Sequence, residues 1–144
     1  MRWVTREGAR VDRIACPWLI RRFVDPKAEF IYVPQEQVSR VAAGGAIPFD
    51  VSGVELGHRN GRCSFESILD KYELRDPALA VLAKIVHGAD VEKDLAVSPQ
   101  AAGLKAIADG FAFLYGTRDQ EKLAAESPMY DALYEWCRRQ TAAA

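Results

Sequence analysis

Short apolar runs separated by helix breakers make up the first sixty residues. β-branched and aromatic side chains gather in these runs, which is typical of strands, and EFIYV has the strongest strand character. Between the runs, Asp25-Pro26 and Gly44-Gly45 end two helical segments, because proline and glycine disfavour continuation of a helix. The expected strands are 3–5, 29–33, 47–51 and 54–56, and the expected helices are 17–24 and 36–43.

From Ser64 onward the apolar positions recur at spacings of three and four, which is the period of a helix. Ser64 is a candidate N-cap, and the pairs Asp-Pro at 76–77 and Ser-Pro at 98–99 combine a capping side chain with proline in the first turn. Gly88 and Gly116 are expected C-caps. These signals predict helices at 64–72, 77–88 and 99–115, and a last helix starting at Pro128.

Strands therefore precede helices along the chain. This order predicts the α/β class in its α+β form, with a small sheet from the N-terminal part covered by a C-terminal layer of helices. The 144 residues suit one domain, 1–144, large enough to bury a core without disulfides or a structural metal. A metal ion, if bound, is therefore expected to serve function.

Charge and cysteine usage exclude several classes of protein. The net charge of −1 excludes a nucleic-acid or membrane binder that works by bulk electrostatics. No apolar run approaches the ~20 residues that span a bilayer, and the N-terminus has no signal-peptide pattern. Three cysteines without paired spacings argue against a disulfide scaffold. We expect a cytoplasmic protein.

The first candidate site combines arginines with a cysteine. The first 25 residues contain six arginines and no lysine, against three acidic residues. With Pro17 in the first turn of a helix, the Cys16 thiol would lie at a helix N-terminus, which favours thiolates and anions. Arg13, Arg21 and Arg22 complete a predicted oxyanion pocket. The alternative is a buried, inert cysteine and arginines that form surface ion pairs.

The second candidate site uses the two histidines of the chain. His58 lies near Glu66 in the sequence, and His87 lies near Asp90. Two imidazoles and one or two carboxylates suit a divalent metal such as Zn, Fe or Mn, so the four residues are predicted to form one metal site. Cys63 is a further candidate ligand. The alternatives are a helix-end role for His87, a backbone-bonded loop role for His58, and a packing role for Cys63.

Five runs occur in the chain in this order: VDRIACPWLIRRFVDPKAEFIYVP, VELGHRNGRCSFE, IVHGAD, AAGL and MYDALYEWCRR. They resemble the chromate-resistance domain family, which includes the C-terminal part of a bacterial chromate-resistance regulator. The resemblance covers nearly the whole chain. It implies a bacterial protein linked to chromate tolerance, often beside a chromate efflux pump. In the regulator the domain follows a DNA-binding segment, and the present chain begins almost at the domain, so no direct nucleic-acid binding is expected.

Four functions remain open at this point, of which a purely structural interaction module is the last. The first is binding or sensing of a small oxyanion, chromate or sulfate, by the arginine-rich stretch. The second is a metal-dependent enzyme or metal sensor at the histidine site, which is compatible with the first because a bound cation is a natural partner for an oxyanion. The third is thiol redox chemistry at Cys16. The sequence is compatible with a homodimer and predicts no membrane partner.

Overall fold

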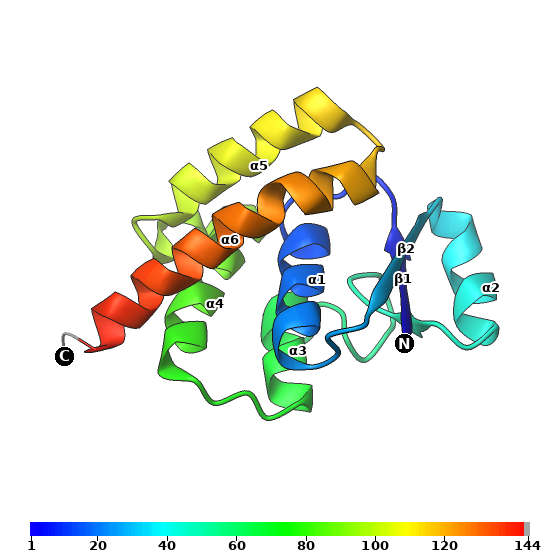
Figure 1. Cartoon of the computed structure of the whole chain (residues 1–144), viewed down its shortest axis with the longest axis horizontal. Helices are drawn as coiled ribbons and strands as arrows, with labels where there is room; N and C mark the ends of the chain where they lie inside the picture. The colour runs from blue at the N-terminus through cyan, green and yellow to red at the C-terminus, as the bar shows by residue number, and fades with distance from the viewer. Residues whose placement is uncertain (143–144) are drawn as a thin grey trace.

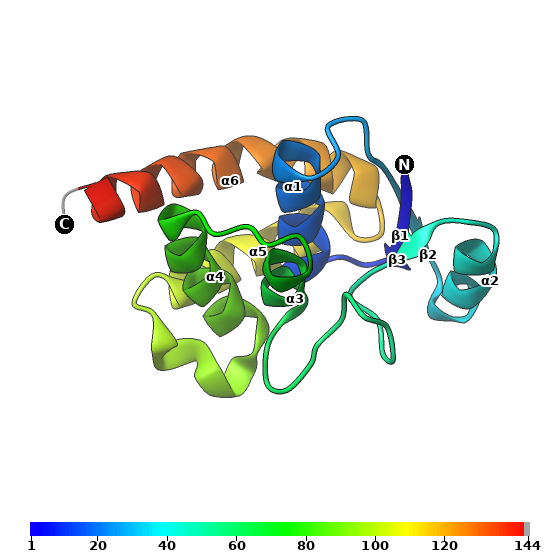
Figure 2. The ribbon, with the colours of Figure 1, turned by 90° about the horizontal axis from the view of Figure 1, so that it is seen from below.

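The computed structural model describes residues 1–142 and forms an α+β fold, as the sequence predicts. A small sheet and a short helix lie at one side, and a layer of longer helices fills the other (Figures 1 and 2). The elements follow in the order β1 (Arg2–Arg6), α1 (Asp12–Phe23), β2 (Glu29–Val33), η1 (Gln35–Gln37), α2 (Val38–Ala43), β3 (Ile47–Pro48), α3 (Ser64–Lys71), α4 (Pro77–Asp90), η2 (Glu92–Val97), α5 (Ala101–Tyr115) and α6 (Asp119–Ala142).

The three strands are parallel and lie in the order β2-β1-β3. The chain passes from β1 through α1 to β2 on one side of β1, then returns through α2 to β3 on the other side. The strand order therefore reverses at β1. In open parallel sheets, ligands bind beyond the carboxyl ends of the strands at such a switch point.

Strand alternation gives the sheet two different faces. Trp3 and Phe30 point into the main core, which extends to the helical layer. The neighbouring Val4 and Ile31 point the other way, into a small cluster completed by Val38 of α2. The helices α1 and α2 therefore cover opposite faces of the sheet (Figure 1).

The first helix starts five residues earlier than the sequence predicts. It begins at Asp12 and contains Pro17 inside it, because the segment around the proline is buried from Ile14 to Ile20 and this burial outweighs local propensity. Pro17 has no N–H to donate to the carbonyl four residues back, that of Arg13. The Tyr32 hydroxyl of β2 donates to that carbonyl instead, at 2.6 Å.

Several other predicted boundaries are wrong. The last helix begins at Asp119 and includes Pro128, and Gly88 lies inside α4 instead of capping it. The strand at 47–51 is reduced to β3, and 54–56 forms turns. The close approach of α5 and η2 explains Gly88, since a Cβ there would lie 2.7 Å from the Ala101 Cβ of α5 and 3.1 Å from a methyl group of Val97 in η2. Along the described chain, none of the helices has both the length and the apolarity needed to cross a membrane.

Candidate functional site

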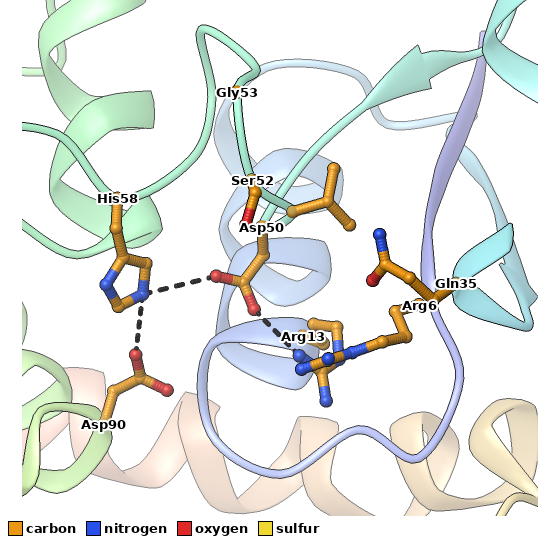
Figure 3. A pocket seen from close by; sticks show the side chains of 9 residues that line it. Arg6, Arg13, Gln35, Asp50, Ser52, Gly53, His58 and Asp90 are labelled. Carbon is orange, nitrogen blue, oxygen red and sulfur yellow. Dashed lines mark hydrogen bonds and ion pairs between the residues drawn. The ribbon is translucent and has the colours of Figure 1, made fainter. Parts of the chain in front are cut away.

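A polar cavity of about 470 Å³ opens where the carboxyl ends of the strands meet (Figure 3). Arg6 ends β1, Gln35 follows β2, and Asp50 lies two residues after β3. Arg13 of α1, His58 and Asp90 also line the cavity. The cavity therefore lies at the position that the sheet topology favours for a ligand.

Three carboxylates surround one ring nitrogen of His58. The His58 Nε2 atom lies 2.9 Å from Asp90 Oδ2, and 3.4 Å from both Asp12 Oδ2 and Asp50 Oδ1. Ligand atoms of Asp12, Asp50 and His58 all lie within 4.8 Å of one another. His58 comes from the loop before α3 and is half exposed, so the group is open to solvent on one side.

Local hydrogen bonds fix the carboxylates. Asp12, the first residue of α1, is fully buried, and its Oδ2 atom accepts from the Ser64 amide at 2.8 Å. Asp50 has a φ of 49° and accepts from the Ser64 hydroxyl at 2.6 Å and from Arg13 Nη1 at 3.3 Å. Asp90, the last residue of α4, accepts from the Asp12 amide at 3.4 Å. The N-terminus of α3 thus holds two of the carboxylates in place.

The electrostatics of the group show an excess of negative charge. Burial raises the pKa of Asp12, and the Asp90 charge raises it further. The pKa of Asp90 is raised for the same reasons, by burial and by Asp50. Hydrogen bonds to Asp12 and Asp50 raise the pKa of His58 to about 11. The imidazole is therefore positively charged at neutral pH and partly offsets the carboxylates.

The structure separates the four predicted metal ligands into two groups. His58 contacts Asp90, and His87 contacts Glu66, so each histidine is paired with the carboxylate that sequence proximity assigns to the other. Nδ1 of His87 lies 2.6 Å from Glu66 Oε1, and its Nε2 lies 2.7 Å from Asp94 Oδ2. Cys63 completes the second group.

The residues of the predicted oxyanion pocket do not line one common cavity. Cys16 lies in the second turn of α1 and is fully buried, and burial raises the pKa of its thiol well above the usual value. Arg21 donates to the Ala28 carbonyl at 3.1 Å, and Arg22 pairs with Asp131 at 2.8 Å. Of the predicted set, only Arg13 reaches the cavity. The expected position of Cys16 at a helix N-terminus is wrong, because α1 begins at Asp12 and not at Pro17.

Asp12 and Asp50 are the carboxylates around His58 that the sequence analysis missed. Each stands at the end of a regular element, Asp12 at the start of α1 and Asp50 just after β3. A carboxylate directly after a strand of a parallel sheet is a recognisable signal. A helix start and a strand end, however, are seen to meet at one site only once the strand order is known. Asp94 was missed because η2 has no clear pattern in the sequence.

The fold and the cavity together define a class: a small α+β protein with an acidic, histidine-containing pocket at the switch point of a parallel sheet. The family model described as "ChrB, C-terminal domain" matches residues 3–137, and the chain belongs to this family. The predicted resemblance to the chromate-resistance domain family is thereby confirmed.

A relative in a bacterium supports the same assignment. The "Protein ChrB" of Cupriavidus metallidurans (strain CH34) is 39% identical over 109 residues, which cover 75% of this chain and 32% of that protein. The match thus spans about a third of the length of the relative. No solved structure matches the chain significantly.

Proposed function

We propose that the cavity binds a divalent metal ion through Asp12, Asp50, His58 and Asp90, and that this ion helps to hold a small oxyanion in a chromate-related sensing or detoxification role. The observation that carries the proposal is the convergence of three carboxylates from three separate segments on one imidazole nitrogen. Like charges repel at this range, so a cation among them gives a large stabilisation.

The interatomic distances support a shared ion. Bonds of about 2.0–2.2 Å to one ion place neighbouring ligand atoms about 2.9–3.6 Å apart. The three distances from His58 Nε2, 2.9, 3.4 and 3.4 Å, fall in that interval. In addition, the buried Oδ1 atom of Asp12 has no hydrogen-bond partner among residues 1–142. An unpaired buried carboxylate oxygen is costly, and a nearby cation lowers that cost.

The ligand chemistry favours a borderline or hard ion. Carboxylates suit Mn²⁺, and imidazole suits Zn²⁺ and Fe²⁺, so a set of one nitrogen and three carboxylates fits Zn, Fe or Mn. Because His58 is half exposed, solvent or a ligand can approach the ion from the cavity. The ion would then act as a Lewis acid toward that ligand.

Arginines supply the second half of the proposed site. Arg6 and Arg13 both line the cavity, and Arg13 is held by Asp50 and by the Gly8 carbonyl at 3.1 Å. Planar guanidinium groups bind tetrahedral oxyanions through paired hydrogen bonds. Chromate and its isostere sulfate are the anions to test. The cavity of about 470 Å³ is large for such an anion, and this favours a metal-dependent enzyme acting on a larger substrate as the second candidate.

Calorimetry with Mn²⁺ tests the metal site. Chelator-treated protein without a His-tag is expected to bind one Mn²⁺, and Asp90→Asn, which keeps the shape and the acceptor oxygen, is expected to weaken binding by at least about tenfold. The control Asp131→Asn removes an exposed carboxylate that contacts Arg22 and should bind as the unaltered protein does. Absence of Mn²⁺, Zn²⁺ and Fe²⁺ binding to the wild-type cavity would refute the metal part of the proposal.

The oxyanion part needs a separate titration. Mn²⁺-loaded protein is titrated with chromate and with sulfate, and Arg6→Gln is expected to weaken binding of both, since Arg6 is exposed and its loss spares the fold. Arg40→Gln, an exposed arginine outside the cavity, is the control. If neither chromate nor sulfate gives a heat of binding at equal metal loading, the oxyanion part is overturned. The metal-dependent enzyme is then the favoured candidate.

A further inference from the structure

A second cluster of metal-binding side chains lies where α3 begins, apart from the cavity. It contains Cys63, the N-cap of α3, Glu66 in the first turn of that helix, and His87 in the last turn of α4. Asp94 of η2 contacts the far side of the imidazole. We infer that Cys63, Glu66 and His87 bind a Zn²⁺-like ion through a thiolate, independently of the cavity and of the function proposed for it.

The geometry of the three groups is close to that of a bound ion. One ligand atom from each residue lies within 4.8 Å of the other two. The His87 Nδ1 atom lies 2.6 Å from Glu66 Oε1, and the Cys63 amide donates to the same oxygen at 2.9 Å. Tetrahedral zinc sites place nitrogen and oxygen ligands about 3.3 Å apart. A side-chain movement of less than about 1 Å therefore brings His87 Nδ1 and Glu66 Oε1 to this separation.

Asp94 provides independent support for this inference. Histidines that bind metal through one ring nitrogen almost always donate the other N–H to a carboxylate or carbonyl, which fixes the tautomer and the ring orientation. Here Nε2 of His87 lies 2.7 Å from Asp94 Oδ2, so the imidazole presents Nδ1 toward Glu66 and Cys63. An ion pair with Glu66 alone would not require a second carboxylate on the opposite side.

Burial and charge also fit a bound cation. Cys63 is fully buried, and the side chains of Glu66 and His87 are only 16% and 13% exposed. One thiolate and one carboxylate together neutralise a divalent ion, so the complex carries no net charge into a weakly polar surrounding. The thiolate also distinguishes this cluster from the cavity, whose oxygen and nitrogen ligands suit harder ions.

A bound ion at this cluster would link three elements. Cys63 is the N-cap of α3 and Glu66 lies in its first turn, His87 belongs to α4, and Asp94 holds η2 against them. Ser64, the neighbour of Cys63, fixes Asp12 and Asp50 beside His58. Occupancy of the cluster would thus stabilise the helix end on which the cavity depends.

Cobalt absorption tests the inference, because a Co²⁺–thiolate bond gives an intense near-ultraviolet charge-transfer band that oxygen and nitrogen ligands do not give. The cavity is first filled with Mn²⁺, and the reduced protein is then titrated with Co²⁺. We expect the band to saturate at one equivalent, to disappear on addition of excess Zn²⁺, and to be lost in Cys63→Ser. Cys137→Ser, which removes another buried cysteine, should keep the band.

Two further variants separate this site from the cavity. His58→Ala is expected to abolish Mn²⁺ binding and keep the cobalt–thiolate band, whereas His87→Gln is expected to lose the band and keep Mn²⁺ binding. Absence of the band from the wild-type protein refutes the inference without any variant, and assigns the cluster to a hydrogen-bonded network only. A band that persists in Cys63→Ser also refutes it.

Discussion

A buried glutamate in the last helix should make the protein less stable at alkaline pH. Glu126 of α6 is fully buried, and over residues 1–142 neither of its carboxylate oxygens has a hydrogen-bond partner. Burial raises its pKa from 4.5 to about 8, although the Lys122 charge one turn away opposes the change. Lys122 itself donates to the carbonyls of Ala9 and Gly116 and to Asp119, so its hydrogen bonds are used elsewhere.

The sign of the effect follows from proton binding. Between pH 4.5 and about 8 the folded protein keeps the Glu126 proton that the unfolded chain has lost, so the free energy of unfolding falls as pH rises. Each pH unit in this interval is worth about 1.4 kcal/mol, which gives an upper limit of about 5 kcal/mol. Glu126→Gln has no such proton, so its advantage over the wild type should grow from near zero at pH 4.5 to a few kcal/mol at pH 9.

Urea unfolding followed by circular dichroism at pH 5, 7 and 9 measures this difference. Glu121→Gln is the matched control, because Glu121 is exposed on the same helix and its difference from the wild type should not change with pH in this way. The pH dependence of every other group cancels when variant and wild type are compared. A constant difference between Glu126→Gln and the wild type across the three pH values would refute the reasoning.

Three more predictions follow from the packing and the site. Gly88→Ala should destabilise the fold by about 1–3 kcal/mol in thermal or urea unfolding, because its Cβ would overlap Ala101, and a gain in stability from the higher helix propensity of alanine would contradict the packing. Cys16 should react with iodoacetamide far more slowly in the folded protein than in urea, and equal rates would show that it is accessible. In metal-free protein the imidazole signals of His58 should show no titration between pH 6 and 8, since its pKa is raised to about 11; a midpoint near 6.5 would contradict the contacts with Asp12 and Asp50.

The two proposed metal-binding clusters differ in what holds them in place. The cavity depends on loops and helix ends that meet beyond the sheet, with Ser64 bridging Asp12 and Asp50. The cysteine cluster lies between α3, α4 and η2, within the helical layer. Ser64 and Cys63 are adjacent in the chain, so both clusters use the start of α3, although their side chains form separate groups.

The sequence by itself determined the elements with strong local signals. The run 29–33 forms the predicted strand, Asp76 caps α4 as expected through a 2.8 Å bond to the Ala78 amide, and Gly116 ends α5. These features depend on the preferences of neighbouring residues, which a sequence displays directly. The sequence also sufficed for the fold class and the family.

Only the tertiary structure decided which side chains meet. Proximity in the chain pairs His58 with Glu66 and His87 with Asp90, whereas packing of α3 against α4 exchanges the partners. Pro17 lies inside a helix because burial of α1 outweighs its local penalty, and this displaces Cys16 from a helix end into the core. Contacts between residues distant in the chain arise from burial of whole elements, and a local pattern does not encode them.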